Sequence, residues 1–388
     1  MLPFDIDNPT LALAAWSRIC EPGDEDAGRL IKAGGPSAAL HWLVEQGSQT
    51  TAGGKGVRHA VERWLPRLKD LDPRRELKTL ASLGGRLLTP ESPEWPSGLN
   101  DLGDGAPLCL WVWAAPQTDL ANWWSRSISI VGARACTCYG QTVARSLASD
   151  LVGAGFTVVS GGAFGIDAAA HLGALAAGGR TTAVMAGGVD RLYPKANEDM
   201  LRQIAKLGAV VSELPPGSAP RRERFLDRNR LMAAMTSATV VVESAWRSGA
   251  HRTAHVAAEL MRPVAAVPGP VTSAASAGCH RLVRDGVATL VADCAQLLDL
   301  VSKVGSQIEP LTDHPSGPLD GLSAPERRVY DALPQRQIAR TSQVVVASGL
   351  AATQVIAALS RLERAGRVCG ISGGWRRTAP NEPRRKES

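Results

Sequence analysis

The sequence lacks the features of membrane and secreted proteins. Its 388 residues contain no run of about eighteen uncharged apolar residues, so we predict no membrane span. The N-terminus has no basic stretch followed by an apolar one, which predicts that no secretory signal is present. The seven cysteines are scattered, and Cys136 and Cys138 form no CxxC motif. We therefore expect a cytoplasmic protein with free thiols and no metal site.

Two signatures of nucleotide chemistry are also missing. A dinucleotide-binding turn has the pattern G-x-G-x-x-G, whereas Gly161, Gly162 and Gly165 are spaced differently. The PGGxGTxxE signature of nucleotide phosphoribohydrolases does not occur. Asp167 and His171 lie four residues apart and share a helix face, but no nucleophile stands near them in the sequence, so we interpret them as a local pair. We predict no cofactor and no catalytic residue.

The pattern of apolar residues predicts an α/β protein. Strand-like runs occur at 127–132, 156–162, 181–188, 209–213, 239–245 and 263–269, and helix-like segments between them include 139–151, 166–177 and 253–261. The strands are apolar on both faces, which is typical of a parallel sheet covered by helices. This pattern predicts an α/β core whose parallel sheet binds ligands at its carboxyl edge.

The same reading divides the chain into five parts. They are a small helical domain (1–76), the α/β domain (77–300), a linker (301–320), a winged-helix domain (321–378) and a tail (379–388). The linker follows from a stretch rich in Pro, Gly and Asp, and the winged helix from three short helical segments followed by two strand-like ones. The formal net charge is +6, with an acidic first segment and the excess of positive charge further on, which favours an anionic partner.

Two loops at the carboxyl ends of predicted strands favour phosphate binding. Gly161 and Gly162 leave backbone N–H groups bare where a helix begins, and such a helix start attracts anions. Arg134 follows the strand at 127–132, beside Gly132 and Thr137, and so belongs to the same edge of the sheet. We therefore expect the glycine loop to hold phosphate, with Arg134 directed into the same crevice.

The segment APRRERFLDRNR (219–230) adds five arginines, at positions 221, 222, 224, 228 and 230, against Glu223 and Asp227. Phe225 lies among them, and we expect it on a loop. Arginines neutralise phosphates and an exposed aromatic ring stacks on a base, a combination that suits single-stranded nucleic acid. We expect Phe225 and Arg134 on opposite lips of one crevice.

Taken together, these segments resemble the DNA-processing protein A (DprA/Smf) family. The resemblance rests on VGARACTCYG, SGGAFGIDAAAH, GRTTAVMAGGVDRLYP, SELPPG, FLDRNRLMAAM, SAWRSGAHRTA and AVPGPVTSAASAGCHRLVRDG, in unbroken order over about residues 80 to 290. Three positions depart from the family's usual residues. Thr137 replaces a Ser, Leu226 a Pro and His280 an Asn.

The resemblance implies that residues 77–300 form an extended Rossmann-like domain. It also implies a non-enzymatic protein that binds and protects single-stranded DNA and helps to load the RecA recombinase in natural transformation. It also implies a homodimer. The DNA-binding residues expected from the motifs are Gly132, Arg134, Thr137, Ser160, Gly161, Gly162, Arg222, Phe225, Arg228, Asn229, Arg230, Ser248 and Gly249. The alternatives are a winged-helix transcription regulator with a Rossmann-like ligand domain, or a nucleotide phosphoribohydrolase.

Overall fold

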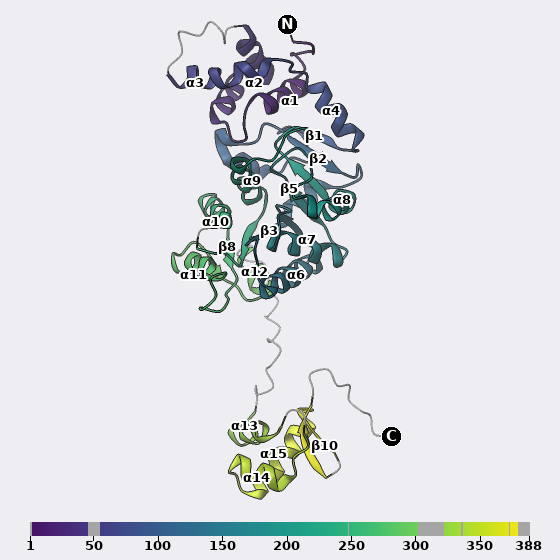
Figure 1. The fold of residues 1–388 in the computed structure, drawn as a ribbon, viewed down its shortest axis with the longest axis vertical. Coiled ribbons are helices and arrows are strands. Elements are labelled where there is room, and N and C mark those ends of the chain that lie inside the picture. Colours follow the sequence, from purple (N-terminus) through teal and green to yellow (C-terminus); the bar gives the residue numbers. More distant parts are fainter. Residues whose placement is uncertain are drawn as a thin grey trace. The chain divides into compact units, whose positions relative to one another are not determined.

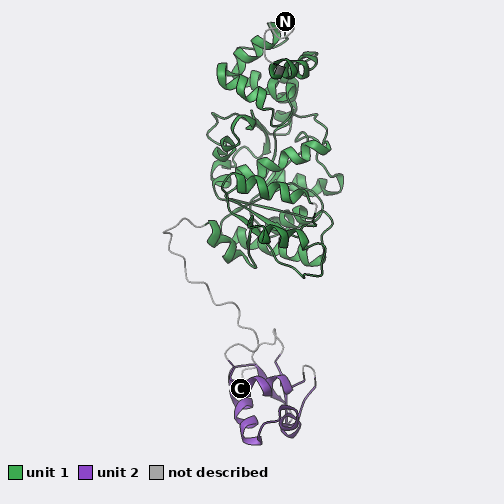
Figure 2. Ribbon diagram, turned by 90° about the vertical axis from the view of Figure 1, so that its left-hand side faces the viewer, with its two compact units in different colours: residues 1–306 green, residues 307–388 purple. Residues whose placement is uncertain are grey.

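The chain forms two compact units, Met1–Ser306 and Gln307–Ser388 (Figure 1, Figure 2). The computed structural model describes residues 2–45, 55–246, 248–301, 322–334, 337–371 and 373–378. Apart from residue 301, the predicted linker and tail lie outside the described residues.

The first unit begins with a bundle of helices, as predicted. They are α1 (Pro9–Ile19), α2 (Glu25–Glu45), α3 (Lys55–Trp64), η2 (Leu65–Leu68) and α4 (Pro73–Ser82). The Asn8 side chain accepts the N–H groups of Thr10 and Leu11 and so starts α1. The rings of Trp16 and Trp64 meet edge to face with centroids 5.3 Å apart, and they anchor the core of the bundle.

The predicted boundary between residues 76 and 77 falls inside α4. The helix starts at Pro73, after the capping side chain of Asp72, and its Leu80 is buried in a core shared with Trp111 of the sheet. The indole N–H of Trp111 also donates to the Ser17 hydroxyl of α1, over 3.3 Å. The bundle and the sheet therefore share one core.

A single sheet forms the centre of the first unit. Its order is β1 (Arg86–Leu88), β2 (Leu110–Ala114), β6 (Ala209–Ser212), β5 (Thr181–Val184), β4 (Thr157–Ser160), β3 (Ser127–Gly132), β7 (Ala238–Val242), β8 (Val264–Ala266) and β9 (Thr289–Leu290). From β6 to β9 all neighbours are parallel, which confirms the Rossmann-like α/β fold. The sequence reading missed β1 and β2, which pair antiparallel at the β6 edge. β1 has only three residues and β2 is almost fully buried, so neither shows an alternation of apolar and polar residues.

Helices cover both faces of this sheet (Figure 1). One face carries α6 (Cys138–Gly153), α7 (Ile166–Ala176), α8 (Glu198–Leu207, after η4, Lys195–Asn197) and α12 (Cys294–Val301). The other carries η3 (Ser97–Gly105), α5 (Leu120–Ser125), α9 (Arg222–Met235), α10 (Gly249–Glu259) and α11 (Ala277–Arg284). Ile128 and Ile130 of β3 face the first layer and Val131 faces the second, so the strand is buried on both sides.

The second unit consists of α13 (Ala324–Ala332), α14 (Thr341–Ser348), α15 (Ala352–Arg364), β10 (Val368–Ile371) and β11 (Gly374–Arg377). Three helices and a hairpin therefore lie where the sequence placed them, and the assignment as a winged helix stays a prediction. Among the described residues no single helix has the length and apolar composition to cross a membrane. Only α14 and α15 taken together, across a bend of 108°, meet that requirement.

Candidate nucleic-acid interface

A groove of about 500 Å³ opens at the carboxyl edge of the sheet, in the first unit. Its lining comes from segments that follow three parallel strands, β3, β5 and β6: Arg134, Tyr193, Pro220, Arg221, Arg222, Phe225 and Leu226. Carboxyl ends of parallel strands meet at one edge, which brings these distant segments together.

Two aromatic rings and one guanidinium group form the wall of this groove. The Cζ atom of Arg134 lies 5.0 Å from the centroid of the Phe225 ring, in a cation–π contact. The Tyr193 ring lies 5.8 Å from that of Phe225, centroid to centroid, and remains 47% exposed. Arg134 and Phe225 thus share one crevice, as expected, but they touch instead of facing each other across it.

Phe225 is not on a loop, as the sequence reading had it, but in the first turn of α9. The run from Arg222 to Met235 contains no Gly or Pro and is rich in Arg, Leu, Met and Ala, which favour helix. The helix fixes the direction of the ring and leaves it half-buried. Phe225 is therefore held rigidly toward the groove.

The exposed arginines of the groove are not neutralised by the protein itself. Arg134, Arg221 and Arg222 are exposed, and none forms an ion pair with another residue in the part of the chain that the structure describes. The groove thus presents three positive charges beside an aromatic surface.

Two other arginines of the same run are engaged in ion pairs inside the first unit. Arg224 donates to the Glu21 carboxylate over 2.8 and 3.0 Å, which ties α9 to the N-terminal bundle. Arg230 donates to both oxygens of Glu213, each over 2.6 Å. Arg230 was expected to bind DNA, but Glu213 neutralises it within the fold. It lies six residues after Arg224 on α9, where its side chain points inward.

Arg228 is a buried structural side chain with only 6% of its surface exposed. Its Nη1 donates to the carbonyl oxygens of Gly161 and Val184 over 2.7 and 2.8 Å, and its Nε donates to Asn229. A Cβ atom on Gly161 would lie 1.8 Å from Nη1, so only glycine fits there. Burial lowers the pKa of Arg228. Arg228, expected at the DNA surface, lies beneath the glycine loop instead.

The glycine loop binds an anion that belongs to the protein itself. The Asp167 carboxylate accepts the N–H groups of Gly161 and Ala163 over 3.2 and 3.4 Å. Ser160, Gly161 and Gly162 are buried, and the Ser160 hydroxyl donates to a carbonyl of β3 over 2.6 Å. Burial raises the pKa of Asp167, while the nearby Arg228 charge opposes that rise. The expected phosphate site at these amides is therefore filled, because Asp167 in the first turn of α7 reaches back to them.

His171 does not pair with Asp167. Its Nδ1 lies 2.7 Å from the hydroxyl oxygen of Thr181, which in turn donates to the Val158 carbonyl. The imidazole is fully buried, and burial lowers its pKa to about 3, with a further contribution from the Arg228 charge. His171 is therefore a neutral core residue at neutral pH.

The start of α6 is closed in the same way. The Glu243 carboxylate accepts the backbone N–H of Thr137 over 2.8 Å and also its hydroxyl, which itself caps the helix by accepting the Gly140 N–H. Gly132 is packed so closely that a Cβ atom there would lie 2.0 Å from the carbonyl oxygen of Val242. Thr137 and Gly132, both expected to contact DNA, thus position Glu243.

The remaining expected residues lie beside the groove. Ser248 caps α10, where its hydroxyl oxygen accepts the Ala250 N–H over 3.3 Å. Asn229 is buried and donates to the Gly249 carbonyl over 3.2 Å, which joins α9 to α10. His280 lies on α11, with Nε2 3.0 Å from the Gly269 carbonyl oxygen, and does not line the groove.

The sequence reading did not assign three of the lining residues to the site: Tyr193, Pro220 and Arg221. Tyr193 follows the predicted strand at 181–188 and so belongs to the same edge, a signal that could have identified it. Arg221 was counted in the arginine run but not assigned to the site.

A second hollow, of about 660 Å³, lies among the N-terminal helices. Its three arginines all form ion pairs with carboxylates of the bundle: Arg63 with Asp24 and Asp26, Arg67 with Glu21, and Arg29 with Asp26. Among the described residues no group of three His, Cys, Asp or Glu side chains is arranged to hold a metal ion. The groove at the carboxyl edge is therefore the better candidate for an anionic ligand.

Comparisons with known proteins agree on one family. The family model for DNA recombination-mediator protein A matches residues 86–302. A Mycobacterium tuberculosis protein named for DNA processing (DprA) is 42% identical over 96% of this chain and 95% of its own length. DNA processing protein DprA of Streptococcus pneumoniae is 40% identical over 50% of this chain and 66% of its own. The X-ray structure of the S. pneumoniae protein superimposes with a TM-score of 0.56 at 28% identity and covers 67% of this chain and 91% of that one.

Proposed function

The chain belongs to the DNA recombination-mediator protein A family, and on this premise we propose that it binds single-stranded DNA in the groove lined by Arg134 and Phe225. The relatives named above are DNA processing proteins, and a role in DNA processing agrees with the cationic groove. We propose in addition that this DNA is single-stranded.

The observation that carries the proposal is the Arg134–Phe225 contact with Tyr193 beside it. Bases of a single strand are free to stack on an aromatic ring, whereas those of a duplex are already stacked on one another. Arg221 and Arg222, which line the same groove, supply positive charge for the phosphates on either side of a stacked base. Neither stacking nor phosphate contact reads sequence, so we expect binding that tolerates any sequence.

Further parts of the proposal rest on the family resemblance. They are protection of incoming DNA, loading of the RecA recombinase in natural transformation, action as a homodimer in the cytoplasm and the absence of enzymatic activity. The structure offers one supporting argument for the last point. The carboxylates of Asp167 and Glu243 are buried and bonded to backbone amides at helix starts, where a nucleotide phosphate would otherwise bind.

Binding of fluorescent oligothymidylate, followed by polarisation over a salt series, tests the proposal. We expect tighter binding to the single strand than to a duplex of equal length, with a log–log salt slope of about 0.7 for each neutralised phosphate. A salt-independent affinity would contradict it. Tight, sequence-specific duplex binding would instead support the transcription regulator, and saturable hydrolysis of a nucleoside monophosphate lost in Glu243→Gln would support the phosphoribohydrolase.

A further inference from the structure

A second cluster of arginines around an aromatic ring lies at the same edge of the sheet, after β7, the neighbour of the strand that Arg134 follows. Trp246 follows β7 and is 50% exposed. The Cζ atoms of Arg281 and Arg284, on α11, lie 4.8 and 5.8 Å from the centroid of its ring. The arrangement repeats that of Arg134 on Phe225, with a larger ring and a second guanidinium group.

We propose that Trp246, with Arg281 and Arg284, is a second base-stacking site for the same DNA strand that occupies the groove. The proposal rests on the proposed function and extends it. The two arginines share one carboxylate, that of Asp285, over 3.2 and 2.9 Å, so the cluster keeps an excess positive charge. A large exposed ring beside an excess of positive charge suits a nucleobase followed by its phosphate.

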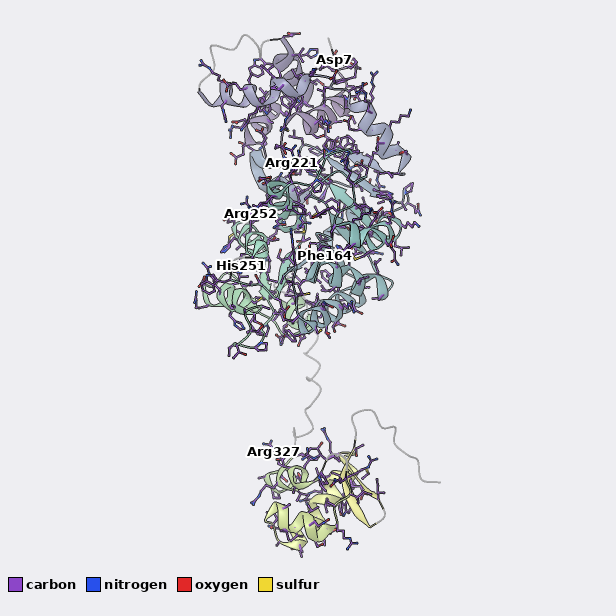
Figure 3. The ribbon with its side chains drawn as sticks, in the orientation of Figure 1. Asp7, Phe164, Arg221, His251, Arg252 and Arg327 are labelled. Carbon is purple, nitrogen blue, oxygen red and sulfur yellow. The ribbon has the colours of Figure 1, made fainter. Side chains whose placement is uncertain are left out.

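Helices α9 and α10 lie between the two sites, and Arg252 of α10 is exposed. Asn229 of α9 bonds to the start of α10, and His251 of α10 reaches α11, where a Cβ atom on Gly278 would lie 2.5 Å from its Nε2. Figure 3 shows Arg221 of the groove, Arg252 and His251 following one another along one side of the first unit.

The electrostatics of the residues between the sites agree with this path. Burial raises the pKa of Asp227, beside the groove, and the charges of Arg230 and Arg252 oppose the rise. Burial lowers the pKa of His251, with a further contribution from Arg281. The Arg252 charge therefore acts on Asp227, beside the groove, and the Arg281 charge acts on His251, near Trp246. A DNA strand that extends from Phe225 to Trp246 would pass Arg252 and His251.

The alternative occupant of this cluster is a second copy of the chain. A two-fold symmetric contact centred on the cluster would bring it against itself and set like charges together. A polyanion neutralises those charges, so the cluster favours the DNA strand.

Oligonucleotide length separates the two sites. For an oligothymidylate of about four nucleotides, long enough for one site only, we expect Trp246→Ala to bind like the wild type. For one of about twelve nucleotides we expect its affinity to fall about tenfold, and Trp246→Phe, which keeps a ring, to retain most of it. Arg281→Ala should lower the salt slope for the longer strand by about 0.7. Phe225→Ala should weaken binding of both lengths.

The matched control is Arg180→Ala. Arg180 also covers a tryptophan ring, that of Trp123, with Cζ 5.3 Å from the centroid, but at the opposite, amino edge of the sheet. We expect this variant to bind both lengths normally. The melting temperatures of all variants show whether each is folded. If Trp246→Ala does not fold, Trp246→Phe and Arg281→Ala still test the site.

Three results would overturn the inference. If Trp246→Ala and Arg281→Ala bind the longer strand like the wild type while Phe225→Ala is weak, the second site does not exist and the groove remains. If Trp246→Ala changes the sedimentation coefficient in the absence of DNA, the cluster is a contact between copies of the chain. If Phe225→Ala binds both lengths normally, the proposed function itself fails.

Discussion

The groove and the layer directly beneath it contain the same kinds of side chains in opposite situations. In the groove, Arg134 and Arg222 are exposed and have no acidic partner in the described parts of the chain. Beneath it, Arg228 bonds to two backbone carbonyls and Asp167 to two backbone amides, and both side chains are buried. Charged side chains at the carboxyl edge therefore have two functions. The inner charges hold the loops in place, and the outer ones remain free for a ligand.

The inner layer also explains why the edge is rigid without a bound ligand. In many Rossmann-like proteins a phosphate occupies the helix start that follows a glycine loop. Here the Asp167 carboxylate occupies the glycine loop before α7, and the Glu243 carboxylate occupies the start of α6. The loops that hold Arg134 are thereby fixed in the free protein, which lowers the entropy lost when DNA binds.

The largest effect is expected for Arg228→Met, which keeps a long side chain but removes the charge. The change leaves the carbonyls of Gly161 and Val184 without their donor and the buried Asp167 without its nearest positive charge. We expect a loss of about 3–5 kcal/mol in the free energy of unfolding, measured by urea denaturation. Arg222→Met is the control and should unfold like the wild type. A stable Arg228→Met protein that fails to bind DNA would reverse the assignment of the two layers.

Phe225→Ala tests the outer layer by itself. If the ring stacks on a base, the free energy of binding to oligothymidylate should weaken by about 1–3 kcal/mol, because one stacking contact is lost. The salt slope should hardly change, since no charge is removed. The melting temperature decides the interpretation. If the melting temperature and the affinity for oligothymidylate both fall strongly, Phe225 is a core residue.

His171 distinguishes the layers by their response to pH. Its pKa is about 3 in the fold because the imidazole is buried, against an ordinary value of about 6.5. Below pH 6.5 the unfolded chain takes up a proton that the folded protein does not, so stability should fall as the pH falls from 6.5 toward 3. Between pH 7 and pH 5 we expect this group to lower the free energy of unfolding by about 2 kcal/mol.

The measurement is the difference in unfolding free energy between the wild type and His171→Gln at each pH, because other buried groups titrate in the same range. The difference should grow in favour of the variant as the pH falls. Equal pH dependence in the two proteins would contradict a buried, neutral His171. Binding through arginines should change little over this range, since arginine keeps its charge.

The fold could be predicted from the sequence much further than the site could. Apolar runs bounded by turn residues identified β3 with its observed ends and the helix of α7 to within one residue. The short antiparallel strands β1 and β2 left no periodic signal, and α4 crossed the expected boundary because its apolar side packs on the sheet. Local patterns therefore determined elements, while edges and boundaries depended on tertiary packing.

For the site, the sequence located the correct edge but could not sort its arginines. Arg222, Arg224, Arg228 and Arg230 stand within nine residues, and only the direction of α9 decides which of them reach solvent. In the same way, bare amides after two glycines predict an anion, but not that Asp167, six residues after the first glycine, supplies it. These outcomes depend on three-dimensional directions that composition and spacing do not contain.

The smallest effect sharpens the comparison most, because it uses two arginines at opposite ends of one strand. Arg134 follows β3 and covers Phe225 at 5.0 Å, and Arg126 precedes β3 and covers Phe156 at 4.8 Å. The two contacts are alike, but only Arg134 lies at the carboxyl edge. We expect Arg134→Ala to lower the salt slope of oligothymidylate binding by about 0.7, which is about 1 kcal/mol at 0.1 M salt, for every sequence tested. Arg126→Ala should leave slope and affinity unchanged. If both substitutions lower the slope equally, the DNA follows the general positive charge of the protein, and the groove has no special part in binding.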